Sequence, residues 1–197
     1  MSAARERILA TAFRLFYAKG IRAVGVDLII AESGVAKATF YKHFPAKDDL
    51  VLAYLDKVDG IWSGQLHDAA AAAGPDPAHQ LVGLFDALGS ACRREGYRGC
   101  AFINAAAESS PGTPIHERTV AHKASVLAWV RELAQQAGAP DPAGLARSLT
   151  LLLDGGLASG ALDASPEAPE AAKASARALV AAVGTGPFAS GIDPTPR

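Results

Sequence analysis

Hydrophobic residues recur every three or four positions along most of the chain, a spacing that places them on one face of an α-helix. The first such stripe, in residues 3–19, consists of Ile8, Leu9, Ala12, Phe13, Leu15 and Phe16. A shorter apolar segment follows at 26–33, and a third helix is predicted over 37–43. Phe40 and Phe44 are four residues apart, so we expect them to share one buried face.

Breaks rich in Gly and Pro divide the rest of the chain into longer helical segments. Further helices are predicted over about 47–73, 77–94, 100–108, 115–137, 142–162 and 166–183. Asp48 and Asp49 lie in the first turn of the first of these, where the helix dipole favours negative charge. No segment stands out with the two-residue period of a strand, so the pattern predicts an all-α fold. Residues 185–197 are rich in Gly and Pro, and we expect this tail to be disordered.

The junction between the second and third predicted helices is the most informative feature of the chain. Gly34 can adopt the left-handed backbone conformation that ends one helix and begins a tight turn. The helix that follows carries ammonium, hydroxyl, phenol and imidazole groups outside its buried face. Two short helices joined in this way indicate a helix-turn-helix, whose second helix enters the major groove of DNA.

Side chains on and just after this second helix are the candidates for DNA contact. They are Lys37, Ala38, Thr39, Tyr41, Lys42, His43 and Lys47. Lys37 can donate to guanine, and the methyl group of Ala38 can meet a thymine methyl. The others have donors or charge for phosphate oxygens, and Lys47 also begins the next helix, where its backbone N–H can face a phosphate. Taken singly, these residues also fit packing and solvated positions; the complete motif favours DNA.

Charge and cysteine content add only a little to the prediction of function. The formal net charge is −1, but residues 1–50 carry eight Lys and Arg against five Asp and Glu, while the remainder carries eleven against fifteen. A mildly basic head on an acidic body suits phosphate contact by the head alone. Cys92 and Cys100 match neither a redox pair nor a zinc site, so we expect two reduced packing residues.

No signal peptide or membrane-spanning run is visible in the sequence, so we expect a cytoplasmic protein, and nothing in it calls for a cofactor or a metal.

The N-terminal pattern resembles the tetracycline-repressor (TetR) family of transcription regulators. The resemblance covers residues 3–52 and rests on Gly20, Gly25-Val26-Asp27, Ile29–Val35, Thr39–Pro45 and Lys47–Leu50. It implies a three-helix DNA-binding domain over 1–50 and a helical effector-binding and dimerisation domain over 51–184. The chain departs from the family pattern at Gly25, Ala36 and Ala46, where a hydroxyl residue is common. Ala is a poor N-cap, which costs roughly 1 kcal/mol relative to Ser.

The resemblance also implies a homodimer that binds a palindromic operator as a repressor and is released by a small effector. The last two helices would form the dimer contact. Its candidate residues are Leu145, Leu149, Leu152, Leu153, Gly155, Gly156, Ala158, Gly160, Ala174, Ala178, Leu179, Ala182 and Val183. These residues also suit the core of a single protomer, and both roles can hold.

The middle helices would enclose a pocket for a mostly apolar effector. Its candidate residues are Trp62, Phe85, Leu88, Phe102, Asn104, His122, Val126 and Trp129. Asn104 is the most suggestive polar group, since an unpaired buried amide costs roughly 1–3 kcal/mol. The alternative is that Asn104 bonds backbone groups and that the aromatic residues belong to the core.

Two other classes of function were weighed against a regulator. Four histidines, at positions 67, 79, 116 and 122, lie near acids such as Asp68 and Glu117 and could be imagined in an enzyme. None of the sequence signatures of hydrolases, zinc proteases or nucleotide-binding loops is present, and His116-Glu117 at a helix start is expected to be solvated. A helical scaffold with a degenerate head is the other alternative, which Lys37, Lys42 and Lys47 argue against.

Overall fold

The computed structural model describes residues 2–163 and 166–183, and every regular element in this part of the chain is an α-helix. The helices are α1 (Ala3–Lys19), α2 (Val26–Ser33), α3 (Lys37–His43), α4 (Lys47–Ala72), α5 (Pro77–Gly83), α6 (Phe85–Cys92), α7 (Ala101–Glu108), α8 (Pro114–Gln136), α9 (Pro142–Asp163) and α10 (Glu167–Val183). This confirms the all-α prediction. The tail expected to be disordered lies outside the described residues.

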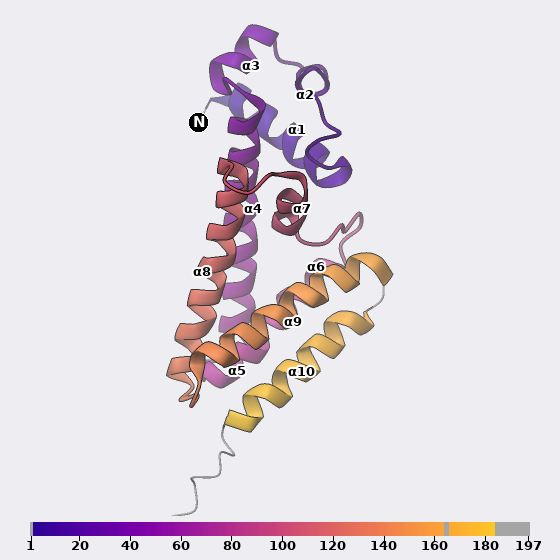
Figure 1. The fold of residues 1–197 in the computed structure, drawn as a ribbon. Coiled ribbons are helices and arrows are strands. Elements are labelled where there is room, and N and C mark those ends of the chain that lie inside the picture. Colours follow the sequence, from indigo (N-terminus) through magenta and orange to yellow (C-terminus); the bar gives the residue numbers. More distant parts are fainter. Residues whose placement is uncertain (1, 164–165, 184–197) are drawn as a thin grey trace, which may run out of the picture.

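Helices α1, α2 and α3 form a small head at one end of the molecule (Figure 1). Gly34 has a φ of 66° and ends α2 in the left-handed conformation, as the sequence predicted. Phe40 and Phe44 are both buried, with ring centroids 6.2 Å apart, which confirms their shared inner face. The inner faces of these helices fix the outward direction of the remaining α3 side chains.

The long helix α4 joins the head to the body and packs against both (Figure 1). Tyr54 of α4 is buried against the rings of Phe13 and Phe16 of α1, with centroids 5.6 and 5.5 Å away. Such edge-on aromatic contacts hold α1 firmly on α4.

Helices α5 to α10 complete the body around the lower part of α4. Helix α8 runs beside α4, and α9 packs against both α8 and α10 (Figure 1). The described buried residues form one continuous hydrophobic core from α1 to α10. Cys100 is buried and Cys92 half-buried, and neither forms a disulfide.

The predicted helix over 77–94 is divided in the structure. Helix α5 ends at Gly83 and α6 begins at Phe85, although Leu84 between them keeps helical dihedral angles. A Cβ atom at Gly83 would lie 2.5 Å from the Cβ of Ala73, so α5 crosses the end of α4 too closely for any side chain. That close crossing could not be read from the periodicity of residues 77–94.

Candidate nucleic-acid interface and interior cavity

The outer side of α3 carries a compact group of exposed side chains. Lys37, Ala38 and Lys42 are exposed, and Tyr41 has 43% of its surface exposed. Thr39 is half-buried beside them. The Nζ atom of Lys37 lies 3.6 Å from the Asp27 carboxylate of α2, and both side chains are exposed. Lys37 can therefore leave this weak surface pair for a stronger partner.

Two of the residues expected at this surface are engaged within the protein. The Nε2 atom of His43 lies 3.1 Å from the hydroxyl of Ser2, which also caps α1. Lys47 points inward: its ammonium donates to the carbonyl of Ile21 at 2.6 Å, and burial lowers its pKa. A phosphate contact by the Lys47 side chain stays a prediction, and one donor of its ammonium is already taken by Ile21. Its backbone N–H remains at the start of α4.

The N-cap residues of α3 and α4 are alanines, whereas hydroxyl residues are common at these positions in the family that the N-terminal pattern resembles. Ala36 and Ala46 both adopt extended dihedral angles before their helices and make no side-chain cap hydrogen bond. At α4, one of the two hydrogen bonds of a reciprocal cap is still present, because the carboxylate of Asp49 accepts the backbone N–H of Ala46 at 2.9 Å. The backbone N–H of Asp49 has no hydroxyl to meet in return.

A serine at position 46 should therefore stabilise the protein. In Ala46→Ser the new hydroxyl accepts the N–H of Asp49 and completes a reciprocal cap, so the free energy of unfolding should rise by about 1 kcal/mol. Urea unfolding of the purified protein measures the change. The matched control is Ala71→Ser, at an exposed position inside α4, where serine should cost about half a kcal/mol. Equal changes in both variants would contradict the capping argument.

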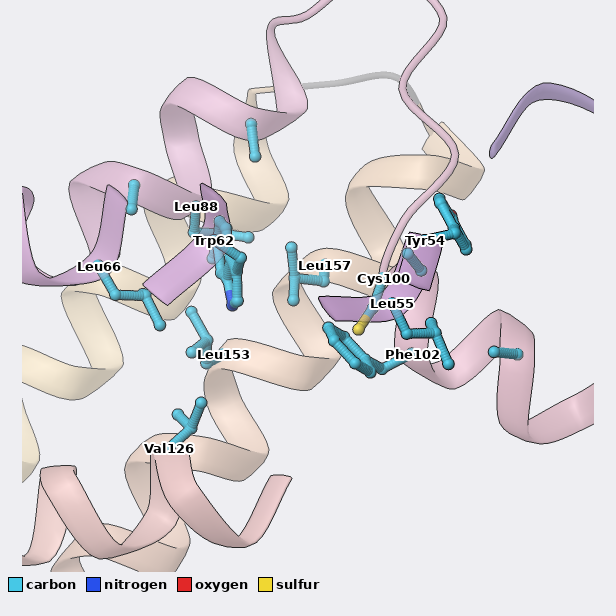
Figure 2. Close-up of a cluster of buried hydrophobic side chains, with 14 of the residues drawn as sticks. Tyr54, Leu55, Trp62, Leu66, Leu88, Cys100, Phe102, Val126, Leu153 and Leu157 are labelled. Carbon is cyan, nitrogen blue, oxygen red and sulfur yellow. The ribbon is translucent and has the colours of Figure 1, made fainter. Parts of the chain in front are cut away.

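A pocket of about 420 Å³, open to solvent beside the exposed Ile103 and Val120, lies between α4, α7, α8 and α9. We call it the central cavity. Its apolar wall includes Trp62, Phe102, Val126 and Leu153, which come from four different helices (Figure 2). Trp62 and Phe102 also line a second space of about 150 Å³ that reaches Tyr17 of α1. A third hollow, of about 700 Å³, lies near α5 and α10 and is lined by charged residues including Asp86, Lys173 and Arg177.

Half of the predicted pocket residues line the central cavity, namely Trp62, Phe102, His122 and Val126. The other four lie elsewhere. Phe85 and Leu88 are core residues, and the ring of Trp129 meets His67 edge-on at 4.2 Å between centroids. Asn104 is exposed, and its amide donates to the carbonyl of Arg98 at 3.0 Å. Asn104 therefore bonds a backbone group, which was the alternative to a role in the effector pocket.

A buried polar cluster beside the cavity was not found from the sequence. His122 is 1% exposed, and its Nδ1 atom lies 2.6 Å from the carboxylate of Asp59 on α4. The guanidinium of Arg118 joins that carboxylate at 2.7 Å and also bonds Asp56 at 2.7 Å. The ring of His122 stacks on Phe102 with centroids 3.6 Å apart. The cluster thus links α4, α7 and α8.

The charges in this cluster follow from its hydrogen bonds and its burial. Burial alone would raise the pKa of Asp59, but hydrogen bonds from Arg118 and His122 lower it below its usual value. Burial lowers the pKa of His122, against the opposing influence of the Asp59 carboxylate. At neutral pH the cluster therefore holds an ionised Asp59 beside a neutral His122.

Helix α7 also touches the head at both of its ends. Before it begins, the hydroxyl of Tyr17 donates to the carbonyl of Gly99 at 3.2 Å and accepts the N–H of Arg98 at 3.0 Å. At its last residue, the carboxylate of Glu108 accepts the backbone N–H of Arg22 at 2.6 Å, and its carbonyl accepts Nε of the same arginine at 3.0 Å. We call these contacts the α7 clamp.

The outward side of α9 carries an exposed apolar stripe. Leu151, Gly155, Ala158 and Leu162 recur every three or four residues, and the two leucines are 67% and 84% exposed. On α10, Ala174, Ala178 and Leu179 are exposed, as is Ala182. The side chain of Val183 lies outside the described residues.

Other residues expected at the dimer contact pack within the protomer. Leu149, Leu153, Gly156 and Gly160 are buried, and Leu145 and Leu152 are half-buried. A Cβ atom at Gly156 would lie 2.5 Å from Leu88, and one at Gly160 would lie 2.5 Å from the sulfur of Cys92. These glycines allow α9 to approach α6 within the chain.

The histidines other than His122 differ in their exposure. His67 and His79 are exposed, and His116 is half-buried with Nδ1 buried and unpartnered, so it is less solvated than expected. Among the described residues, no group of three or more His, Cys, Asp or Glu side chains could hold a metal ion. No described helix has the length and apolar character needed to cross a membrane.

Comparisons with known proteins agree with this geometry. Residues 8–54 match the family model "Bacterial regulatory proteins, tetR family". The crystal structure of SCO4454, a TetR-family transcriptional regulator from Streptomyces coelicolor, superposes with a TM-score of 0.85 at 41% identity, covering 91% of this chain and 95% of that one. The regulator sav143 from Streptomyces avermitilis gives a TM-score of 0.82 at 27% identity, covering 93% and 99%. The Escherichia coli HTH-type transcriptional regulator YjdC is 26% identical over 77% of this chain and 80% of its own length.

Proposed function

The chain belongs to the TetR family of DNA-binding transcriptional regulators, and we propose that it is a homodimeric repressor released from a palindromic operator by a small, mostly apolar effector. Its relatives are regulators and not enzymes. The observation that carries the proposal is the exposed group Lys37, Ala38, Tyr41 and Lys42 on α3, turned outward by the buried Phe40. Base-edge and phosphate donors on one short helix suit a major groove.

The dimer is the second part of the proposal. One helix-turn-helix is too small for tight specific binding, and two-fold pairs of heads read two half-sites. The exposed stripes of α9 and α10 supply a face for a second copy, with Leu151, Ala158 and Leu162 among its apolar residues. Large exposed apolar side chains gathered on one face support an interface there.

The effector is the third part, and the central cavity supports it. The volume of about 420 Å³ falls in the range of small-molecule sites, and the lining is mostly apolar. Phe102 lies on α7, the helix whose two ends clamp the head. A ligand that favours one position of α7 would shift the spacing of the two heads by population shift.

The direct test is binding to the intergenic DNA beside the protein's own gene. We expect tight binding that falls steeply as salt rises, because each neutralised phosphate releases counterions. Fluorescence anisotropy over a range of salt concentrations gives both the affinity and the slope. A protein that stays monomeric and ignores this DNA at low ionic strength would contradict the proposal.

Lys42→Ala should weaken binding to every DNA sequence by a similar factor, because we assign its ammonium to a phosphate. The slope of log affinity against log salt should become shallower by about one unit for each neutralised phosphate lost. The measurement is anisotropy on the operator and on an unrelated duplex of equal length. A loss confined to the operator would show that Lys42 reads bases instead.

Lys37→Ala should relax sequence preference more than it lowers general affinity. We assign Lys37 to a guanine, and a good base contact is worth about 1–3 kcal/mol of discrimination. Selection of bound fragments from random duplexes, done with both proteins, shows which base pair loses its preference. The exposed Lys57 of α4, which lies over the ring of Phe13 away from α3, gives the matched control Lys57→Ala. Unchanged preference in Lys37→Ala would move the base contact to another residue.

A further inference from the structure

We propose that the central cavity binds an uncharged, mostly apolar molecule that carries a carbonyl or ether oxygen, and that the indole N–H of Trp62 donates a hydrogen bond to this oxygen. The inference rests on the proposed function, because it names the chemistry of the effector. It concerns one cavity and one indole nitrogen, so measurements of ligand binding test it without DNA.

Among the described residues, three buried ones in the wall of the central cavity have polar side chains, namely Trp62, Thr119 and His122. The hydroxyl of Thr119 donates to the carbonyl of His116 at 2.6 Å. The Nδ1 atom of His122 lies 2.6 Å from the carboxylate of Asp59, and its Nε2 atom is fully enclosed by protein, so a ligand cannot reach it. Trp62 is therefore the buried residue in this wall whose polar group a ligand can meet.

The indole N–H of Trp62 makes no hydrogen bond to any described residue, although the residue is only 9% exposed. Its nitrogen is not one of the unpartnered atoms that the protein fully encloses, which are Nδ1 of His116 and Nε2 of His122. Figure 2 shows this nitrogen at the edge of the ring turned toward Leu153, another residue of the cavity wall. The N–H is therefore within reach of a ligand in the cavity.

The chemistry of the indole group decides what the ligand has to offer. An indole nitrogen donates and does not accept, so the partner of Trp62 is an acceptor such as a carbonyl or ether oxygen. A pure hydrocarbon in the cavity would cover the N–H without giving it a partner, which carries a desolvation penalty. An oxygen at the same place removes that penalty. The cavity therefore discriminates between molecules of equal shape by their hydrogen-bonding groups.

A carboxylate also accepts hydrogen bonds, but the charges around the cavity disfavour an anion. Lys123 and Asp154 are the charged side chains among the described lining residues, and they form an ion pair with each other. Arg118, nearby, is held by the carboxylates of Asp56 and Asp59. An anion placed here would lose hydration without meeting an unpaired positive charge, so the geometry favours a neutral acceptor.

The test uses two pairs of probes that have the same shape and differ in one oxygen atom. They are 2-acetylnaphthalene with 2-isopropenylnaphthalene, and benzophenone with 1,1-diphenylethylene, so that a methylene group replaces the carbonyl oxygen in each pair. Calorimetric titration of the full-length protein gives the ratio of ketone to alkene affinity. The anion 2-naphthoate is titrated as well, and it should bind more weakly than 2-acetylnaphthalene; tighter binding of the anion would overturn the uncharged class.

Trp62→Phe keeps an aromatic ring in the wall and removes the N–H, so the ratio of ketone to alkene affinity should fall by about 10-fold. Because the ratio in one protein is compared with the ratio in the other, the greater hydrophobicity of the alkene cancels. The matched control is Trp129→Phe, which changes the other tryptophan, half-buried against His67 and outside the cavity, and should leave the ratio intact. Equal ratios in the unmodified protein and Trp62→Phe, or no binding of any probe to the unmodified protein, would overturn the proposal.

Nuclear magnetic resonance detects the hydrogen bond directly and does not depend on the folding of Trp62→Phe. The chain has two tryptophans, so protein labelled at tryptophan nitrogen gives two indole signals, which Trp129→Phe assigns. The indole proton of Trp62 should move downfield with each ketone relative to the matching alkene, because a hydrogen bond deshields the proton. A signal that moves equally with ketone and alkene would contradict the bond.

DNA release is measured separately, by anisotropy with each probe present. Probes that bind with the ketone preference but leave DNA affinity unchanged support the ligand class and contradict the ligand-responsive function. DNA binding without any ketone preference contradicts the ligand class and leaves the regulator intact.

Discussion

Leu151→Glu should convert a dimeric protein into a monomer and lower its affinity for a two-half-site operator by about 1,000-fold or more. Leu151 is 67% exposed in the protomer and lies in the apolar stripe of α9 with Gly155, Ala158 and Leu162. In a dimer packed on this stripe, a glutamate there would be buried without a partner, which a dimer contact cannot tolerate. Because the side chain is exposed in the single protomer, the fold itself should survive.

The measurement pairs sedimentation for oligomeric state with anisotropy for DNA affinity. The control is Ala71→Glu, which adds the same charge at an exposed position of α4 and should leave both quantities unchanged. The free energy of unfolding of the monomeric variant should be compared at equal protein concentration, since a dimer gains stability by mass action. A Leu151→Glu protein that remains dimeric and binds the operator normally would place the interface on another face.

The sequence predicted most helix boundaries because each is marked by residues with a direct physical effect. Gly34 ends α2 in a left-handed conformation, and Pro114 and Pro142 each stand at the first position of a long helix. The exception was the division of α5 from α6, which lies where Gly83 crosses Ala73, just after the end of α4, too closely for a side chain. Local signals therefore located the elements, and the one division they missed lies at a close tertiary contact.

The functional residues were harder to predict than the helices. A helical period shows which face of a helix is buried, but it does not show whether that face lines a cavity or packs in the core. The same apolar spacing applies to Phe102, which lines the cavity, and to Phe85, which does not. The Asp59–His122 pair joins residues 63 positions apart on two helices, so the local sequence around either residue does not predict the contact. The one local hint is Ser63, four residues after Asp59 and bonded to it.

The direction of the Lys47 side chain could not be predicted from the sequence, for a different reason. Its position at the start of α4 suggested a phosphate contact, but its ammonium reaches back to the carbonyl of Ile21 and lies over the ring of Phe16. A long side chain at a helix start can turn either way, and here the carbonyl of Ile21, near the start of the α1–α2 loop, accepts its ammonium. That carbonyl is set by the packing of the head, which the sequence does not show.

The cavity and the head are connected through α7. On its inner side Phe102 stacks on His122, and at its two ends the α7 clamp bonds Tyr17 and Arg22. Gly20 allows the clamp to close, since a Cβ atom there would lie 2.8 Å from the Glu108 carboxylate. A ligand that displaces Phe102 can therefore move α1 through polar contacts with defined geometry, in addition to the apolar contact of α1 with α4.

Glu108→Ala is expected to separate ligand binding from DNA release. Ligand and DNA affinities measured one at a time should stay close to those of the unmodified protein, because Glu108 lies outside α3 and the central cavity. The coupling between the two sites is typically about 5- to 150-fold in affinity, and loss of the clamp should reduce it to about 2-fold. Tyr17→Phe removes the clamp at the other end of α7 and should give a partial loss in the same direction.

Operator affinity measured with and without saturating ligand gives the coupling factor, and the reciprocal ligand titration with and without operator must give the same value. The matched control is Glu117→Ala, which removes an exposed carboxylate in the first turn of α8 and should leave the factor unchanged. Unaltered coupling in both Glu108→Ala and Tyr17→Phe would show that α4 alone carries the movement. In that case the aromatic contacts of Tyr54 with Phe13 and Phe16 would be the connection between cavity and head.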